Sequence, residues 1–244
     1  MRKYILIILF ILFHSFAQAS VFKIMPVGDS ITIGTGDFGG INGFGYRDHL
    51  QTLLGNGIYT FVGDYADPGS APSNGGFSNG HQAQSGEQPA TTHTNLPSAL
   101  VDFMTDCTTD CIVLILSGIN GSPGGTGQIP SDVGQLIDDV TAANSTTKVF
   151  VGNYIDWSEN DELLAMVTSR QVTKTNLYFV DINQAFHDAD PSYASTLMAD
   201  EVHPNDSGYQ VMAQAWYDAI VDSMIGVKHG EAKNLALCGG VYFR

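Results

Sequence analysis

Residues 22–30 read Phe-Lys-Ile-Met-Pro-Val-Gly-Asp-Ser. The largely apolar run Phe22–Val27 is bounded by turn residues and predicts a short buried strand. It leads directly into Gly28, Asp29 and Ser30, and the glycine permits a sharp turn. We therefore expect the Ser30 hydroxyl at the carboxyl end of a strand, which is the edge where parallel α/β sheets bind ligands.

The rest of the chain alternates strand and helix patterns. Further strands are predicted at Ile58–Gly63, Cys111–Ser117, Lys148–Asn153 and Asn176–Asp181. Apolar residues at helical spacing predict helices at Tyr46–Leu54, Leu96–Met104, Ile129–Ala142, Ser158–Arg170 and Asp206–Ile225. Such alternation is typical of a parallel sheet covered on both faces. We expect an α/β fold, a three-layer flavodoxin-like sandwich with a five-stranded parallel sheet.

The chain has 244 residues, a length that suits one domain with short appendages. Residues 1–19 resemble a signal peptide, with Arg2 and Lys3, then an apolar run, then Ala17-Gln18-Ala19 as a cleavage pattern. A membrane anchor is the alternative, but the run is short for a spanning helix, which needs about 20 residues. We predict secretion, a folded domain over residues 20–226 and a C-terminal tail of unassigned role over 227–244.

The formal net charge is −15, and removal of residues 1–19, with two basic and no acidic residues, makes it −17. A strongly acidic surface repels nucleic acid and anionic lipid. We therefore expect no nucleic-acid partner, and no membrane contact once the signal peptide is removed. The oligomeric state has no signature in the sequence.

Three cysteines are present. Cys107 and Cys111 are close enough for a local disulfide in an oxidising compartment, and two unpaired thiols are the alternative. Cys238 is left over in the tail. The cysteines and histidines show no metal-ligand spacing, so we expect neither a metal nor a cofactor.

The connection Asp64–Asn95 is rich in Gly, Ser, Asn, Pro and Gln and predicts a long, functional loop. Within it, residues 76–80 read Gly-Phe-Ser-Asn-Gly and match the G-x-S-x-G nucleophile motif. That motif needs a strand before it and a helix after it. The flanking residues here are loop-like, so Ser30 is favoured over Ser78 as a nucleophile.

A serine hydroxyl needs a base to take its proton, and histidine titrates in the right range. Residues 200–203 read Asp-Glu-Val-His. Asp200 and His203 can meet within one turn, and a carboxylate on the second ring nitrogen fixes the tautomer of the base. An exposed histidine in a helix-entry loop is the alternative. His81, His93 and His187 also lie in polar segments; the neighbouring pair His187-Asp188 is disfavoured because adjacent side chains rarely face each other.

Acyl transfer builds negative charge on a carbonyl oxygen, which positioned donors stabilise. The third predicted strand ends in Ser117-Gly118-Ile119-Asn120, so the Asn120 amide is one candidate donor. The N–H of Gly86, in the long connection, is another. Ordinary turns are the alternative at both places.

Taken in order, these segments resemble the SGNH, or GDSL-type, hydrolase family across residues 22–226. The matching blocks are Gly28-Asp29-Ser30, Gly86, Gly118-Ile119-Asn120 and Asp200-Glu201-Val202-His203. The resemblance implies the SGNH hydrolase fold and ester hydrolysis through an acyl-enzyme. It assigns Ser30, His203 and Asp200 as catalytic residues, and Ser30, Gly86 and Asn120 as the oxyanion hole.

Residues 24–32, 59–63 and 203–209 further resemble the carbohydrate-esterase branch that includes acetylxylan esterases. This implies a small ester or an acylated carbohydrate as substrate, with acetylated xylan as an example. Two departures concern substrate preference: Gly121 replaces the usual Asp, and Glu87 stands where an aromatic residue is often found. The alternatives are a lipase or phospholipase, and a carbohydrate-binding protein without activity.

Overall fold

The computed structural model describes residues 22–34, 44–55, 59–66, 80–107 and 111–225. Its strands are β1 (Phe22–Gly28), β2 (Tyr59–Phe61), β3 (Tyr65–Ala66), β4 (Gly80–Ala83), β5 (Cys111–Leu116), β6 (Lys148–Gly152) and β7 (Leu177–Val180). Its α-helices are α1 (Ser30–Ile33), α2 (Tyr46–Leu54), α3 (Pro89–Asp106), α4 (Ile129–Ala143), α5 (Asn160–Gln171), α6 (Ile182–Ala189), α7 (Tyr193–Thr196) and α8 (Asp206–Ile225).

The five strands predicted from sequence pair in parallel, in the order β2-β1-β5-β6-β7. This is the flavodoxin-like order, and it confirms the predicted fold class. β5 occupies one edge of β1 along Lys23–Gly28. β2 and β4 therefore share the other edge, with β2 beside Phe22–Ile24 and β4 beside Val27 and Gly28. β3 adds an antiparallel strand outside β4.

The prediction of a continuous loop over Asp64–Asn95 was wrong. Among its described residues the segment forms β3, β4 and the first turns of α3. β4 reads Gly-His-Gln-Ala and has no apolar alternation, although it is largely buried against β1. α3 begins with Pro89 followed by polar residues, so its apolar periodicity is visible only from Leu96 onward. The short helices α1, α6 and α7 were also absent from the prediction.

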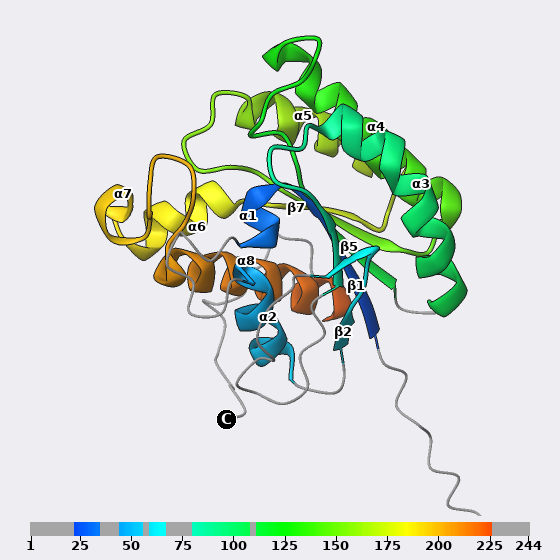
Figure 1. The fold of residues 1–244 in the computed structure, drawn as a ribbon, viewed down its shortest axis with the longest axis horizontal. Coiled ribbons are helices and arrows are strands. Elements are labelled where there is room, and N and C mark those ends of the chain that lie inside the picture. The colour runs from blue at the N-terminus through cyan, green and yellow to red at the C-terminus, as the bar shows by residue number, and fades with distance from the viewer. Residues whose placement is uncertain (1–21, 35–43, 56–58, 67–79, 108–110, 226–244) are drawn as a thin grey trace, which may run out of the picture.

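Helices cover the sheet on both faces (Figure 1). Because successive strand residues point to opposite faces, Ile24 and Leu114 face one core while Met25 and Val113 face the other. The first core packs α2, α6 and α8 against the sheet, around the fully buried Trp216. The second packs α3, α4 and α5. The edge formed by the carboxyl ends of the strands stays available for a site.

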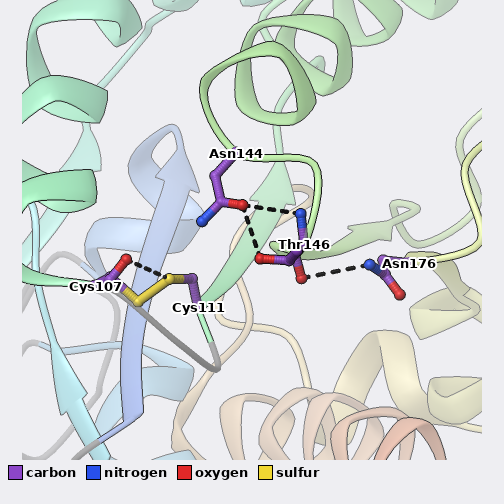
Figure 2. Close-up of a disulfide and its surroundings, with 5 residues drawn as sticks. All are labelled: Cys107, Cys111, Asn144, Thr146 and Asn176. Carbon is purple, nitrogen blue, oxygen red and sulfur yellow. Dashed lines mark hydrogen bonds between the residues drawn. A yellow bond between two sulfur atoms is a disulfide. The ribbon is translucent and has the colours of Figure 1, made fainter.

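The opposite edge, at the amino ends of the strands, is fastened by local links (Figure 2). A disulfide joins Cys107, at the end of α3, to Cys111, at the start of β5. Thr146, before β6, donates its N–H and hydroxyl to the Asn144 side chain, and its carbonyl accepts from Asn176, before β7. These links fix the points where α3 leads into β5 and where β6 and β7 begin, at the edge of the sheet opposite the candidate site.

No helix among the described ranges is long and apolar enough to cross a membrane. The predicted signal peptide (1–19), the predicted tail (227–244) and Cys238 lie outside these ranges, and so does Ser78.

Candidate active site

The turn after β1 holds Ser30 at the carboxyl edge of the sheet. A Cβ on Gly28 would lie 2.2 Å from the Leu116 carbonyl oxygen, so only glycine lets β1 approach β5 here. Asp29 caps α1, and its carboxylate accepts from the Ile31 N–H at 3.1 Å. Ser30 is the first residue of α1 and is 7% exposed. Its hydroxyl is therefore fixed at the start of a helix rather than in a free loop.

The other end of α1 is bound by Arg47, a fully buried residue of α2. Its guanidinium donates to the carbonyls of Thr32 at 3.1 Å and Ile33 at 2.9 Å. A cation at the C-terminus of a helix also complements the negative end of the helix dipole. Arg47 was not predicted from the sequence, although its position three residues before Leu50, on the buried face of the helix, is a detectable signal.

The Ser30 hydroxyl lies 3.0 Å from His203 Nε2, across 173 positions of sequence. His203 Nδ1 lies 3.0 Å from Asp200 Oδ2 and 3.2 Å from Asp200 Oδ1. With the proton on Nδ1 donated to Asp200, Nε2 is left as an acceptor for the serine hydroxyl. The structure thus brings together the three side chains that the sequence singled out, in an arrangement suited to activating a nucleophile.

Asp200 is held by its own turn. Its Oδ1 accepts from the backbone N–H groups of Val202 and His203, both at 2.7 Å, and the Ala199 N–H closes the turn on the His203 carbonyl at 2.8 Å. Partial burial acts to raise the pKa of Asp200. The backbone N–H groups of His203 and Val202 and the His203 ring outweigh it, so the pKa is lowered. The carboxylate is therefore ionised at neutral pH.

Asp29 is a second carboxylate near the reacting pair. It is fully buried, and Tyr154, which follows β6, donates its hydroxyl to Asp29 Oδ2 at 2.6 Å. Burial raises the pKa of Asp29 to about 6, against the opposing effects of the Tyr154 and Ile31 bonds and of the His203 charge. Tyr154 was not predicted from the sequence. Its position just after a strand, at the carboxyl edge of the sheet, was the available signal.

The two other candidate oxyanion donors lie in the loops on either side of Ser30. β4 and β5 flank the end of β1, with Gly28 paired to Ala83 on one side and to Leu116 on the other. Gly86 follows β4 with φ +74°, and an added Cβ would meet no described atom within 4 Å, so glycine is required there by conformation. Asn120 follows β5 and donates one Nδ2 hydrogen to the Glu87 carbonyl at 3.1 Å. Its second amide hydrogen can serve a substrate oxygen.

A pocket of about 410 Å³ adjoins the Asp200 side of this arrangement. Ile31, Ile119, Asp200 and Val202 line it, each a member or a sequence neighbour of the candidate site. The remaining wall is mostly apolar and also carries carboxylates and residues of α7; it includes Tyr154, Ile155, Asp156, Tyr193, Met198 and Glu201. Its volume falls within the range of about 300–1,000 Å³ that is typical of small-molecule sites.

Asp156 borders the pocket and is hydrogen-bonded to two residues that are distant in sequence. Its carboxylate accepts from His187 Nε2 at 2.9 Å and from the Tyr193 hydroxyl. These two bonds, Tyr193 first, lower the pKa of Asp156. Among the described residues it is the one non-glycine residue with a positive φ, +49°. Asp188 is bound by Gln184 rather than by His187, so the carboxylate partner of His187 comes from another loop.

His93 and His81 lie outside this site. His93 Nδ1 contacts Asp139 Oδ2 at 2.5 Å, between α3 and α4. His81 is buried within β4 rather than in a polar loop. In the described part of the chain, no group of three or more His, Cys, Asp or Glu side chains is placed to hold a metal ion.

Comparisons with known proteins agree with this fold. Residues 27–211 match the model of the GDSL-like lipase/acylhydrolase family. A family 3 carbohydrate esterase from Clostridium thermocellum has a TM-score of 0.62 and 22% identity, covering 84% of this chain and 97% of that one. A family 3 carbohydrate esterase from Talaromyces cellulolyticus has a TM-score of 0.64 and 23% identity, covering 85% of this chain and 100% of that one.

One curated relative, a multidomain esterase from Ruminococcus flavefaciens, is 29% identical over 235 residues. The match covers 84% of this chain but 29% of that protein, so the chain spans less than a third of the length of its relative. The family match, by contrast, extends over most of this chain and includes Ser30, Asp200 and His203. The chain therefore belongs to the GDSL-like lipase/acylhydrolase family, a family of acyl-ester hydrolases.

Proposed function

We propose that the chain is a secreted serine esterase that removes small acyl groups, chiefly acetyl, from carbohydrate esters such as acetylated xylan. One observation carries the proposal. The Ser30 hydroxyl lies 3.0 Å from His203 Nε2, and the other ring nitrogen, Nδ1, lies 3.0 Å from the Asp200 carboxylate. That contact gives a weak nucleophile the base that it needs at neutral pH.

In the first half-reaction, Ser30 Oγ attacks the ester carbonyl carbon and its proton passes to His203 Nε2. Asp200 stabilises the resulting imidazolium through Nδ1. The tetrahedral oxyanion accepts hydrogen bonds from the N–H groups of Ser30 and Gly86 and from the Asn120 amide. When the carbon–oxygen bond to the alcohol breaks, His203 returns the proton to the leaving oxygen and an acyl-Ser30 ester remains.

In the second half-reaction, His203 takes a proton from water as the water oxygen attacks the acyl carbon. The new tetrahedral intermediate uses the same donors. It collapses to release the carboxylic acid, and the imidazolium returns its proton to Ser30 Oγ. One ester and one water are consumed, one alcohol and one acid are released, and no cofactor takes part.

The carbohydrate substrate is supported by two considerations. Residues 24–32 and 203–209 resemble the acetylxylan-esterase branch, and both solved relatives above are carbohydrate esterases. The pocket beside Asp200 also carries polar groups suited to sugar hydroxyls, namely Asp156, Tyr193 and Glu201. Secretion is supported by the signal-like pattern in residues 1–19 and by the Cys107–Cys111 disulfide, because disulfides persist in oxidising compartments.

A second candidate function is hydrolysis of longer acyl esters, as in a lipase. The apolar pocket residues Ile119, Ile155 and Met198 favour it, because a longer acyl chain needs an apolar surface. A series of p-nitrophenyl esters from acetate to octanoate separates the two candidates. We expect kcat/KM to be highest for acetate, and a maximum at octanoate would select the lipase.

The reaction itself is tested by S30A with p-nitrophenyl acetate. We expect kcat to fall by at least about 10³-fold, since the nucleophile is lost. Acetate release from acetylated xylan is then compared between wild type and S30A. Undiminished turnover in S30A would remove Ser30 from its role, and xylan binding without acetate release would indicate a carbohydrate-binding protein instead.

A further inference from the structure

Asn120 is bound by the two residues that follow Gly86. Its side-chain Nδ2 donates to the Glu87 carbonyl at 3.1 Å, and its own carbonyl accepts from Gln88 Nε2 at 3.1 Å. The bonds run in opposite directions, so they hold both the backbone and the amide plane of Asn120. The two loops that flank Ser30 are thus tied together at the residue proposed to bind the oxyanion.

Gln88 is itself held in place by hydrogen bonds at the start of α3. Gln88 is the N-cap of the 18-residue helix α3, and its carbonyl accepts from the N–H groups of Thr91 at 2.9 Å and Thr92 at 3.0 Å. The preceding residue is also fixed: the Glu87 N–H donates to Gln84 at 3.1 Å, and its buried carboxylate accepts from Asn95 at 3.1 Å. The backbone from which the Gln88 side chain extends to Asn120 is therefore held in place.

The residue after Asn120 is Gly121, and the space beside it bears on the role of the Gln88 bond. Gly121 stands where the family usually has an aspartate, and no side chain is present there to order the loop. Its φ is +80°, and a Cβ built on it would meet, within 4 Å of the described atoms, only Gln88 Nε2 at 4.0 Å. The Gln88 amide thus lies against the position from which the missing side chain would project.

We propose that Gln88 is a positioning residue of the oxyanion hole, which holds Asn120 in place of the side chain that Gly121 lacks. The inference rests on the proposed ester hydrolysis. A donor helps the transition state only when it is already oriented toward the developing charge. With one Nδ2 hydrogen bound to Glu87, the other is held in a single direction as long as Gln88 fixes the Asn120 backbone.

The test uses Q88E, which keeps the shape of the side chain but replaces the donating amide by a carboxylate, and Q88M, which removes the hydrogen bond without adding charge. Q84E is the matched control, because Gln84 lies in the same loop and its side chain contacts Tyr65 instead of Asn120. Steady-state kinetics with p-nitrophenyl acetate are measured for each variant, for N120A and for N120A/Q88M, with Tm recorded alongside.

We expect Q88E and Q88M to lower kcat about tenfold while KM stays within about twofold, because a transition-state interaction is weakened. N120A should lose about 10²–10³-fold, as for other oxyanion donors. N120A/Q88M should match N120A, because a residue that acts through Asn120 has nothing left to position. Q84E should match wild type.

Wild-type kcat in both Gln88 variants would overturn the inference, and so would losses that multiply in the double variant, or a loss confined to KM or Tm. The proposed function fails in a different way: wild type would then show no turnover, or S30A would retain it. An active wild type with a dead S30A and unaffected Gln88 variants would therefore remove the positioning role alone.

Discussion

The Tyr154 hydroxyl donates a 2.6 Å hydrogen bond to the carboxylate of Asp29, the residue immediately before Ser30, across 125 positions of sequence. Asp29 is fully buried, and its pKa is raised to about 6 chiefly by that burial, whereas the pKa of Asp200 is lowered. Two carboxylates with opposite shifts therefore act on one histidine.

The first prediction concerns the pH dependence of activity. The Tyr154 bond favours ionised Asp29, so Y154F should raise the pKa of Asp29 further above about 6. Ionised Asp29 stabilises the imidazolium of His203, and its protonation should therefore reduce activity. We expect the acidic limb of the pH profile of kcat/KM to move to higher pH in Y154F. Y178F, a tyrosine change in β7, is the control. An acidic limb that does not move in Y154F would show that the ionisation of Asp29 does not affect activity.

The second prediction concerns stability against pH. The folded pKa of Asp29, about 6, lies above its ordinary value of 3.8, so the folded state binds this proton more tightly than the unfolded state does. Its contribution is fully present below pH 3.8 and is lost as pH rises through about 6. D29N keeps an oxygen for the Ile31 N–H and cannot ionise. Relative to D29N, wild type should lose about 2 kcal/mol of unfolding free energy between pH 4 and 7.

Urea unfolding of both proteins at several pH values measures that difference. Parallel curves for wild type and D29N across the range would contradict the raised pKa of Asp29.

The third prediction concerns the Cys107–Cys111 disulfide. It closes a short loop at the amino end of β5, away from the carboxyl edge that carries Ser30. Loop-closure entropy for a ring of this size corresponds to about 2 kcal/mol. We expect C107S/C111S to lower the unfolding free energy by about that amount and to leave kcat/KM unchanged. Addition of a reductant to wild type should reproduce the shift, and a loss of activity before unfolding would contradict the assigned structural role.

The fourth prediction concerns α7 and the pocket wall. Tyr193 holds α7 to Asp156, and both residues line the pocket beside Asp200. Y193F removes this bond and leaves the ring contacts with Phe186 and His187 in place. We expect KM to rise roughly three- to tenfold for a carbohydrate ester, since the wall is loosened, with a smaller change in kcat. Y178F again serves as the control; a kcat loss at constant KM would instead place Tyr193 in the chemical step.

Local patterns in the sequence predicted the parts of the molecule that local physics determines. The apolar runs predicted β1, β5, β6 and β7, and the spacing of apolar residues predicted α2, α4 and α8, because burial on one face imposes its period on the chain. The predicted proximity of Asp200 and His203 matches their contact in the structure, because three residues fit within one turn. β4 could not be predicted in this way, since it is held by its neighbour β1 and not by any pattern of its own.

Local patterns along the chain were enough to predict the parallel α/β sheet, the Gly-Asp-Ser turn at its edge and the proximity of Asp200 and His203. No local pattern along the chain places His203 beside Ser30, Tyr154 beside Asp29 or Gln88 beside Asn120; these contacts form only in the folded chain. Tyr154 and Asp29 follow different strands, as do Gln88 and Asn120, whereas His203 reaches Ser30 from the turn before α8. Which residues meet depends on the order and register of the strands. Order and register depend on the packing of the whole sheet, so they cannot be read from the spacing of residues along the chain.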